Sequence, residues 1–371
     1  MVAHRLSCHL AARGLAVEVL TRRQPRSLGA EDSIDGIRVT RRRFYPGVSE
    51  CLGKGRPDLG LASVLSRSGD ERALRETLKR FKPECVNIHF PDWQVDLIPI
   101  IRSMGNARLV VSLHGDEVMR AVRGDARQLS RLSTALREAD QVTACSGWLL
   151  EKACQLVPEA TGKARVAWNG IEAGLFAGAE PKPWPRPYVL GFGRFVPKKG
   201  FDLLLEAFAR LKKGSGLDLV LVGSGPERDT LASRAKELGV AGRVFFPGRA
   251  FNEEMIRWIR GARMAVVPSR EEPFGIAALE VAAAGVPLVA TAVGGMPEFL
   301  ESLKFEFGLV RMCEPTTESL LLVIQASLGE EQEPGQCAAQ IQSVGETFGW
   351  DQRLEVYDSV LGTGKQASQV R

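Results

Sequence analysis

The chain has 371 residues, of which 44% are hydrophobic and 25% are charged, the composition of an ordinary globular protein of about two domains. No run of about 18 apolar residues occurs, which excludes a predicted transmembrane helix, and charges interrupt the first residues too often for a signal peptide. Seven cysteines without a CxxC pair give no zinc spacing and predict reduced thiols in a cytoplasmic protein.

The net charge of +5 is unevenly distributed along the chain. Residues 1–170 hold 27 basic and 19 acidic side chains, whereas residues 171–371 hold 22 and 25. The excess is concentrated around Arg22, Arg26 and residues 41–43. It predicts either a surface that attracts anionic lipid headgroups or a phosphorylated acceptor, or only a solvated basic face. Aromatic residues are not interleaved with these basic ones, so no nucleic-acid partner is expected.

Helices and strands are predicted to alternate through the first half of the chain. A helix over residues 4–13 ends at Gly14, and Pro99 would interrupt a later helix. The later helices are predicted over residues 72–81 and 95–101, and a loop rich in Gly, Ser and Pro over 46–69. Strands are predicted over residues 16–21, 37–42, 85–90, 109–114, 141–146 and 164–168. Such alternation is typical of a parallel sheet covered by helices on both faces.

A segment with four prolines in eight residues, 180–187, reads EPKPWPRP and is predicted to be a linker. The alternation of strands and helices then begins again. Strands are predicted over residues 188–193, 217–222, 244–246, 264–268 and 287–291, and helices over 200–213, after Pro226, over 274–284 and over 351–361. The sequence therefore indicates two α/β halves.

Two of the carboxylates in the stretch from 264 to 298 are candidates for ligand binding, and the stretch has the pattern strand, loop, helix, strand and loop. Glu272 is in the first loop, and Glu280 follows eight positions later inside the predicted helix. Both can approach one end of the sheet, where parallel α/β folds bind ligands. Glu280 stands in an apolar run, where an unpaired carboxylate would be costly to bury, so a ribose diol is a fitting partner. The alternative is a glutamate at the solvent edge of an amphipathic helix.

Basic and glycine residues follow the strands of the second half. Arg194 and Lys199, in GFGRFVPKKG, lie where a strand ends and a helix begins, a place suited to offset the charge of a diphosphate. The alternative is two solvated side chains at the start of a helix. Gly223 and Gly225 form a turn after the next strand that is either structural or borders a nucleotide. It is no dinucleotide fingerprint, because GxGxxG would need glycine at 196 or 228.

Two histidines, His89 and His114, each end a strand of the first half. A single histidine in such a place is more often structural than catalytic, and His89 is interpreted in that way. Asp116 and Glu117, which follow His114, could orient an acceptor.

The segments PSREEPFGIAALE and GGMPE, together with GR-x4-KG, resemble the donor-binding signature of the family 4 glycosyltransferases, which have the GT-B fold. The resemblance covers nearly the whole chain. It implies two Rossmann-like domains, residues 1–180 on the acceptor side and 181–350 on the nucleotide-sugar side, with a cleft between them. Residues 351–371 would form a helix that packs back on the first domain, and then a tail.

The resemblance also implies the roles of individual residues. The catalytic group would be His114, facing the transferred sugar, with Glu272, Arg194 and Lys199. The donor would be bound by Glu280, Phe274, Gly275, Ile276, Gly193, Gly223, Gly225, Gly248 and Arg249.

By this resemblance the chain is a retaining hexosyltransferase that uses a UDP-sugar or GDP-sugar donor and no metal. The sequence has no Asp-x-Asp, which agrees with the absence of a metal cofactor. The acceptor would be a hydroxyl of a glycan, a glycolipid or a small molecule, as in polysaccharide biosynthesis. The protein would be cytoplasmic, with the basic first half touching the inner face of the membrane as a further expectation.

One departure from the family concerns the first residues. Family members open with a strand and a glycine-rich turn, whereas this sequence starts inside the helix that follows them. The alternative hypothesis is therefore a truncated, inactive protein that still binds a nucleotide sugar. A GT-B epimerase or phosphorylase is a third hypothesis, which the Glu-x7-Glu and GR-x4-KG patterns disfavour.

Overall fold

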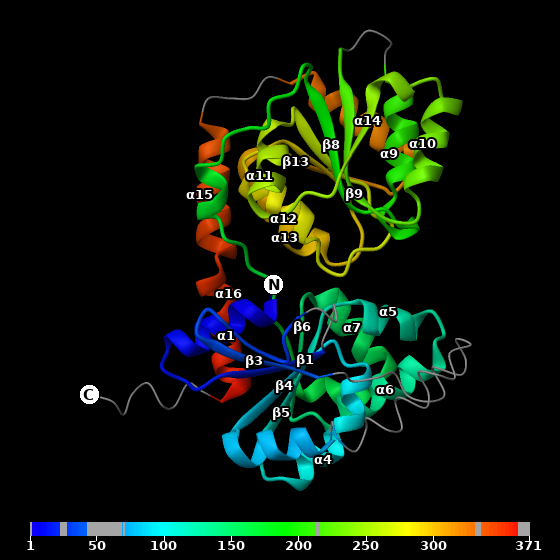
Figure 1. Cartoon of the computed structure of the whole chain (residues 1–371). Helices are drawn as coiled ribbons and strands as arrows, with labels where there is room; N and C mark the ends of the chain where they lie inside the picture. The colour runs from blue at the N-terminus through cyan, green and yellow to red at the C-terminus, as the bar shows by residue number, and fades with distance from the viewer. Residues whose placement is uncertain are drawn as a thin grey trace. The chain divides into compact units, whose positions relative to one another are not determined.

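The computed structural model describes residues 2–22, 28–42, 69, 71–211, 216–330 and 335–362. The chain forms two compact units, which are coloured along the sequence in Figure 1. The first unit holds Met1–Cys145, Leu149–Ala167 and Leu354–Arg371, and the second holds Ser146–Trp148 and Trp168–Arg353. Among the described residues, no helix is both long and apolar enough to cross a membrane.

A small mixed sheet opens the first unit. It has the order β1 (Glu18–Arg22), β3 (Ile37–Arg42) and β2 (Glu31–Ile34), and helix α1 (Val2–Ala12) packs on β3. Strand β2 runs antiparallel to β3 and was not predicted, because all four of its residues are exposed and give no apolar alternation. Asp35 and Gly36 form the turn of this hairpin, with φ of 50° and 78°. An Asp-Gly pair favours such a turn, so it is the local sequence signal for the hairpin.

The second sheet of the first unit is entirely parallel and confirms the predicted strands. Its order is β4 (Cys85–His89), β5 (Arg108–Leu113), β6 (Gln141–Ala144) and β7 (Ala164–Val166). Its helical elements are residues 71–81, η1 (Trp93–Leu97), α4 (Ile98–Ser103), α5 (Asp116–Val122), α6 (Ala126–Glu138), most of α7 (Gly147–Leu156) and η2 (Pro158–Lys163). The helix expected over 95–101 is thus two elements. Pro99 does not interrupt α4 but stands in its first turn, where proline needs no N–H partner.

The predicted loop over residues 46–69 lies outside the described residues except for its last position. The predicted terminal helix is α16 (Trp350–Leu361).

The second unit is built on six parallel strands. Their order is β10 (Val244–Gly248), β9 (Asp218–Ser224), β8 (Tyr188–Arg194), β11 (Met264–Val267), β12 (Leu288–Thr291) and β13 (Val310–Cys313). The chain moves outward from β8 to β10 and then returns to the other side of β8 with β11. Strands β8 and β11 therefore flank the topological switch point, beside which open α/β sheets bind their ligands.

Helices cover both faces of this sheet (Figure 1). One face carries α9 (Phe201–Ala209), α10 (Arg228–Glu237) and α14 (Thr317–Leu328), and the other carries α11 (Asn252–Gly261), α12 (Ile276–Ala283) and α13 (Met296–Phe307). The remaining elements are α8 (Gly174–Ala177), η3 (Pro197–Lys199), η4 (Ala241–Arg243) and α15 (Gln336–Phe348). The apolar core includes the fully buried Phe195, Phe201 and Phe208, which pack with the leucines of β9.

The proline-rich segment is anchored on the second unit. Trp184 donates from its indole to a carboxylate oxygen of Asp218 at 2.9 Å, and the Arg186 guanidinium lies 2.9 Å from the other oxygen. Asp218 is only 1% exposed at the start of β9. The predicted linker is therefore held by a buried carboxylate that the sequence did not single out.

Candidate active site

Two loops meet at the carboxyl ends of β8 and β11, which are hydrogen-bonded neighbours in the sheet. The backbone N–H of Arg270 donates to the carbonyl of Lys198 at 2.8 Å. Gly200 has φ of 65°, and a Cβ built on it would lie 2.0 Å from the carbonyl oxygen of Pro268. Only glycine allows so close an approach, so the glycine of the KG pair is required by packing between the loops.

An ion pair joins these loops at Glu272, whose carboxylate oxygen Oε2 contacts the Lys199 ammonium. Ser269 donates from its hydroxyl to the same oxygen at 3.3 Å. Glu272 is 8% exposed, and Thr291 at the end of β12 holds the Ser269 carbonyl through its own hydroxyl. The structure therefore brings two of the four predicted catalytic residues into direct contact.

A second ion pair, missed by the sequence analysis, fixes the same loop. Arg270 donates to the two carboxylate oxygens of Asp202 at 2.7 and 2.6 Å and to the carbonyl of Pro197 at 3.0 Å. This hydrogen bonding to the Asp202 carboxylate raises the pKa of the Arg270 guanidinium. The two residues are 68 positions apart, so only the adjacency of β8 and β11 could have indicated the pair.

The predicted glycine turn at 294–295 supports the backbone of Glu272. Gly294 has φ of 62°, and a Cβ on it would lie 1.9 Å from the Glu272 carbonyl oxygen. The N–H of Gly295 donates to that carbonyl at 3.0 Å. Gly275 is equally constrained, since a Cβ there would lie 2.5 Å from the side chain of Met296.

Glu280 lies on α12 and is only partly exposed. The helix begins at Ile276, with Gly275 as its N-cap at φ of 108°, and not at Phe274 as predicted. The eight positions between Glu272 and Glu280 are therefore not two turns of one helix, because Glu272 stands in the loop. In the described part of the chain, the Glu280 carboxyl has no hydrogen bond or ion pair, and burial raises its pKa to about 7.

The other predicted donor residues lie at the same end of the sheet. Arg194 ends β8 and is exposed. Gly193 pairs with Gly223 across β8 and β9, and a Cβ on Gly223 would lie 1.9 Å from the Gly193 carbonyl oxygen. Gly225 would meet the carbonyl of Phe195 at 2.2 Å. Gly223 and Gly225 thus permit close packing of this turn, and their place beside a nucleotide stays a prediction.

Gly248 and Arg249 are at the end of β10, one strand further from the switch point. Gly248 has φ of 96°, which favours glycine. The Arg249 guanidinium lies over the ring of Phe251, 4.9 Å from its centroid.

His114 belongs to the first unit, at the end of β5. Its Nε2 lies 2.9 Å from Nδ1 of His89, and the ring of Phe90 stacks on it with centroids 4.2 Å apart. Burial lowers the pKa of His89 to about 4 and that of His114 to about 3. Glu117, also buried, accepts from the backbone N–H groups of His114 and Gly115, so its role is to hold this turn.

Comparison with known proteins places these features in one family. The model of Glycosyltransferase Family 4 matches residues 1–174, and that of Glycosyl transferases group 1 matches residues 177–328. A glycogen synthase of Mycobacterium tuberculosis is 30% identical over 311 residues, which are 80% of this chain and 74% of that protein. The chain belongs to the family 4 glycosyltransferases.

Solved structures show the same GT-B fold. The sucrose-phosphate synthase of Thermosynechococcus elongatus is similar with a TM-score of 0.76 at 21% identity, over 99% of this chain and 93% of that one. The Anabaena protein Alr3699/HepE, solved in complex with UDP-glucose, has a TM-score of 0.65 at 19% identity, over 88% and 86% of the chains. The glycosyltransferase assignment and the GT-B prediction are therefore confirmed.

Among the described residues, one group could supply three ligands to a metal ion. His4, Cys8 and Asp35 place their ligand atoms within 4.8 Å of one another on α1 and the turn after β2. His4 and Asp35 are exposed, and none of the three belongs to the predicted donor set of this glycosyltransferase.

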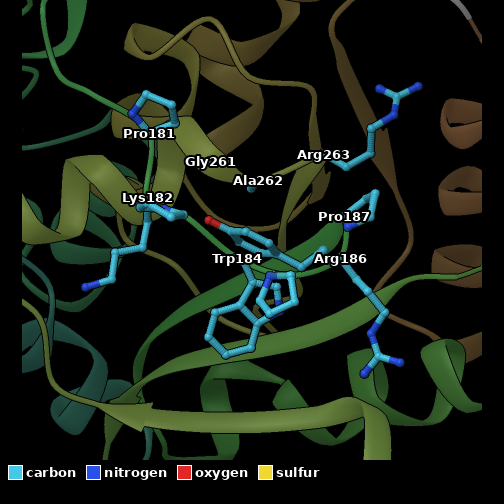
Figure 2. Close-up of a pocket in the computed structure, with 11 residues that line it drawn as sticks. Pro181, Lys182, Trp184, Arg186, Pro187, Gly261, Ala262 and Arg263 are labelled. Atoms are coloured by element: carbon cyan, nitrogen blue, oxygen red, sulfur yellow. The ribbon is translucent and has the colours of Figure 1, made fainter.

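A hollow of about 500 Å³ lies along the proline-rich segment and residues 261–263 (Figure 2). Figure 2 shows the side chains of Lys182, Arg186 and Arg263 extending away from one another rather than into the hollow. No predicted donor or catalytic residue lines it. The hollow is therefore not the candidate site of this enzyme.

Proposed function

We propose that this glycosyltransferase moves a hexose from a nucleotide-diphosphate sugar to an acceptor hydroxyl, with retention of anomeric configuration and without a metal ion. One observation carries the proposal. The ion pair of Lys199 and Glu272 occurs in the same unit as the carboxyl of Glu280, which has no partner among the residues that the structure describes, and both are on the segments that flank the switch point of the sheet. A nucleotide sugar has a charged diphosphate, which a cation can bind, and hydroxyl groups on its two sugar rings, which carboxylates can accept hydrogen bonds from.

The diphosphate would be held by fixed positive groups. Lys199 supplies an ammonium, the exposed Arg194 supplies a guanidinium, and α12 presents the N–H groups of its first turn. Among the described side chains none caps that turn, so the backbone at Phe274, Gly275 and Ile276 can donate to phosphate oxygens. These groups would offset the charge that develops on the departing nucleotide, which is the work that a metal ion does in other enzymes.

The two glutamates would bind different parts of the donor. Glu272 is already oriented by Lys199 and Ser269, and its carboxylate would accept from hydroxyls of the sugar. Glu280 would accept from both hydroxyls of the ribose, whose hydrogen bonds favour the charged form of the carboxyl and lower its pKa. Binding would thus supply the partner that Glu280 lacks within the described ranges of the chain.

In the reaction, the bond between the anomeric carbon and the phosphate oxygen breaks, and its electron pair stays on the nucleotide. The acceptor oxygen bonds to the anomeric carbon on the same face of the sugar, and its proton passes to the departing phosphate oxygen. No protein nucleophile is required, and Glu272 would bind rather than attack.

The uracil nucleotide is the first donor to test, because HepE was solved with UDP-glucose, and the guanine nucleotide is the second. We propose a glycan, glycolipid or small-molecule acceptor and a cytoplasmic location, with a peripheral membrane contact through the basic first half. Arg41 would contribute little to that contact, since it is buried and lies 3.1 Å from Asp32. Arg23, Arg26 and Arg43 lie outside the described residues.

The proposal is tested by calorimetric titration of the full chain with UDP and with GDP in the presence of EDTA. One nucleotide is expected to bind, and Lys199→Ala is expected to weaken it by about 10- to 100-fold, the effect of one charge-assisted hydrogen bond. Lys198→Ala is the matched control. Transfer of labelled glucose from UDP-glucose to candidate acceptors and the anomeric configuration of the product then test the chemistry.

Failure of a folded sample to bind either nucleotide would overturn the donor site. A requirement for Mg²⁺ would overturn metal independence, and an inverted product would overturn retention. Tight binding without hydrolysis or transfer would favour the alternative of an inactive protein that binds nucleotide sugars.

A further inference from the structure

Five polar side chains form a continuous chain through the first unit and end at His114. His89, Ser112 and Thr143 are paired neighbours on β4, β5 and β6, so their side chains share one face of the sheet. Asn87 stands two positions before His89 on the same face, and Tyr357 of α16 contacts the hydroxyls of Ser112 and Thr143. Ser112, Thr143 and Tyr357 are each at most 3% exposed. Hydroxyl groups buried to this degree are normally hydrogen-bonded.

The hydrogen bonds along this chain have one direction. Thr143 donates from its hydroxyl to that of Ser112 at 2.9 Å, and Ser112 donates to the side-chain carbonyl of Asn87 at 2.9 Å. The NH₂ group of Asn87, which can only donate, then lies with its nitrogen 3.2 Å from Nε2 of His89. That nitrogen must accept, so the proton of His89 is on Nδ1, which lies 2.9 Å from Nε2 of His114.

We propose that this relay of Asn87, His89, Ser112, Thr143 and Tyr357 fixes the tautomer of His114, with the proton on Nδ1. Nε2 of His114 accepts the hydrogen bond from Nδ1–H of His89. The Nδ1–H group of His114 can therefore donate to a ligand. His114 then acts as a neutral hydrogen-bond donor, and the relay residues are positioning residues. The catalytic part of this inference rests on the proposed function, whereas the tautomer does not.

Two further observations agree with a neutral, oriented ring. Burial keeps both imidazoles uncharged at neutral pH, as a one-way chain of hydrogen bonds requires. Phe90 holds the ring of His114 from its face, and does so from a backbone φ of 55° that is strained for an aromatic residue. Ring orientation and proton position are thus both constrained.

The substitution Asn87→Asp should reverse the relay. An aspartate at this position accepts from Ser112 but cannot donate to His89, so Nε2 of His89 becomes the donor. Nδ1 of His89 must then accept, which moves the proton of His114 to Nε2. Ser112→Ala, which removes the hydroxyl that orients Asn87, should give a mixture of tautomers. Ser7→Ala is the matched control, because Ser7 is a buried serine of the same unit whose hydroxyl donates to the carbonyl of Ala3 in its own helix.

The experiment is ¹⁵N NMR of the histidine rings in the full chain. The sequence has four histidines, so single His→Gln variants assign the signals. The expected result is Nδ1–H on His114 in the wild type and in Ser7→Ala, and Nε2–H in Asn87→Asp. A wild-type His114 protonated on Nε2, or an Asn87→Asp spectrum identical to the wild type, would overturn the relay. If Asn87→Asp does not fold, Ser112→Ala decides the question: a mixture of His114 tautomers supports the relay, and a spectrum identical to the wild type overturns it.

Activity provides a second and separate readout. With UDP-glucose as donor, Asn87→Asp is expected to lower kcat at least about tenfold, the value of one lost hydrogen bond, while UDP affinity stays unchanged. Unchanged kcat with an altered tautomer would overturn the catalytic use of the relay. A wild type that binds no nucleotide would instead overturn the proposed function, and the NMR spectra would still decide the tautomer.

Discussion

Glu280 is expected to lower the free energy of unfolding of the ligand-free protein, because its carboxylate is placed for binding and not for stability. Its pKa is raised from 4.5 to about 7 by burial. Each pKa unit corresponds to 1.36 kcal/mol, so the ionised carboxylate costs up to about 3 kcal/mol in the folded state. The side chain is partly exposed, and we therefore expect an effect of about 1–3 kcal/mol.

The sign of the pH dependence follows from proton uptake. Between pH 4.5 and 7 the folded protein holds the Glu280 proton and the unfolded chain does not, so the free energy of unfolding falls as pH rises. Above about pH 7 both states have lost the proton, and the cost stays constant. Glu280→Gln removes this cost and keeps the shape of the side chain.

The assay is urea unfolding of the wild type and Glu280→Gln from pH 4.5 to 8. The variant should equal the wild type at pH 4.5 and become more stable by about 1–3 kcal/mol at pH 8, with Tm higher by about 2–4 °C for each kcal/mol. It should also bind nucleotide more weakly. Glu253→Gln is the control, since Glu253 is an exposed glutamate in the first turn of α11. A stability difference that does not change with pH, or a less stable variant at pH 8, would refute the reasoning.

Two other substitutions probe the supports of the site and the linker. Gly294→Ala should lower the free energy of unfolding by more than about 2 kcal/mol, because its Cβ would lie 1.9 Å from the Glu272 carbonyl oxygen and the residue has a positive φ. Gly239→Ala is the control. Gly239 has a φ of 70° but open surroundings, so its substitution should cost only about 1 kcal/mol. Equal losses in chemical unfolding would show that the contact at Gly294 does not matter. Asp218→Asn should cost about 1–2 kcal/mol, less than a fully buried pair, because the partner Arg186 is 48% exposed and remains solvated. An unchanged urea midpoint at pH 7 would contradict this role of Asp218.

Local patterns in the sequence were sufficient to locate most strands of the two sheets that carry the fold, but β13 was not predicted. Apolar runs located β4, β5, β8 and β9 to within about two residues, because a buried parallel strand is a short apolar segment between breakers. The same reasoning failed for β2, whose exposed residues carry no apolar signal, and for the start of α12. Helix α12 begins only at Ile276, because the φ of 108° at Gly275 is not helical.

Candidate residues could also be chosen from sequence, but their partners could not. Lys199 and Glu272 were each predicted as site residues, but they lie 73 positions apart in the sequence. Nothing in either segment indicates that the two side chains contact each other. Arg270 and Asp202 were not selected at all, since a lone arginine and a lone aspartate at the edges of helices are common. Residue type and spacing thus indicated the chemistry of the site and not its connections.

The sequence by itself determined that the chain is an α/β protein of two halves, that it resembles the family 4 glycosyltransferases, and which glycines, cations and carboxylates end the strands. These features are encoded locally, by hydrophobic period and by the backbone freedom of glycine. Only the tertiary structure decided that Glu272 is paired while Glu280 has no partner in the part of the chain that the structure describes, and that a relay from Tyr357 reaches His114. The physical reason is that these contacts depend on strand order and register, which bring together residues that no periodicity relates.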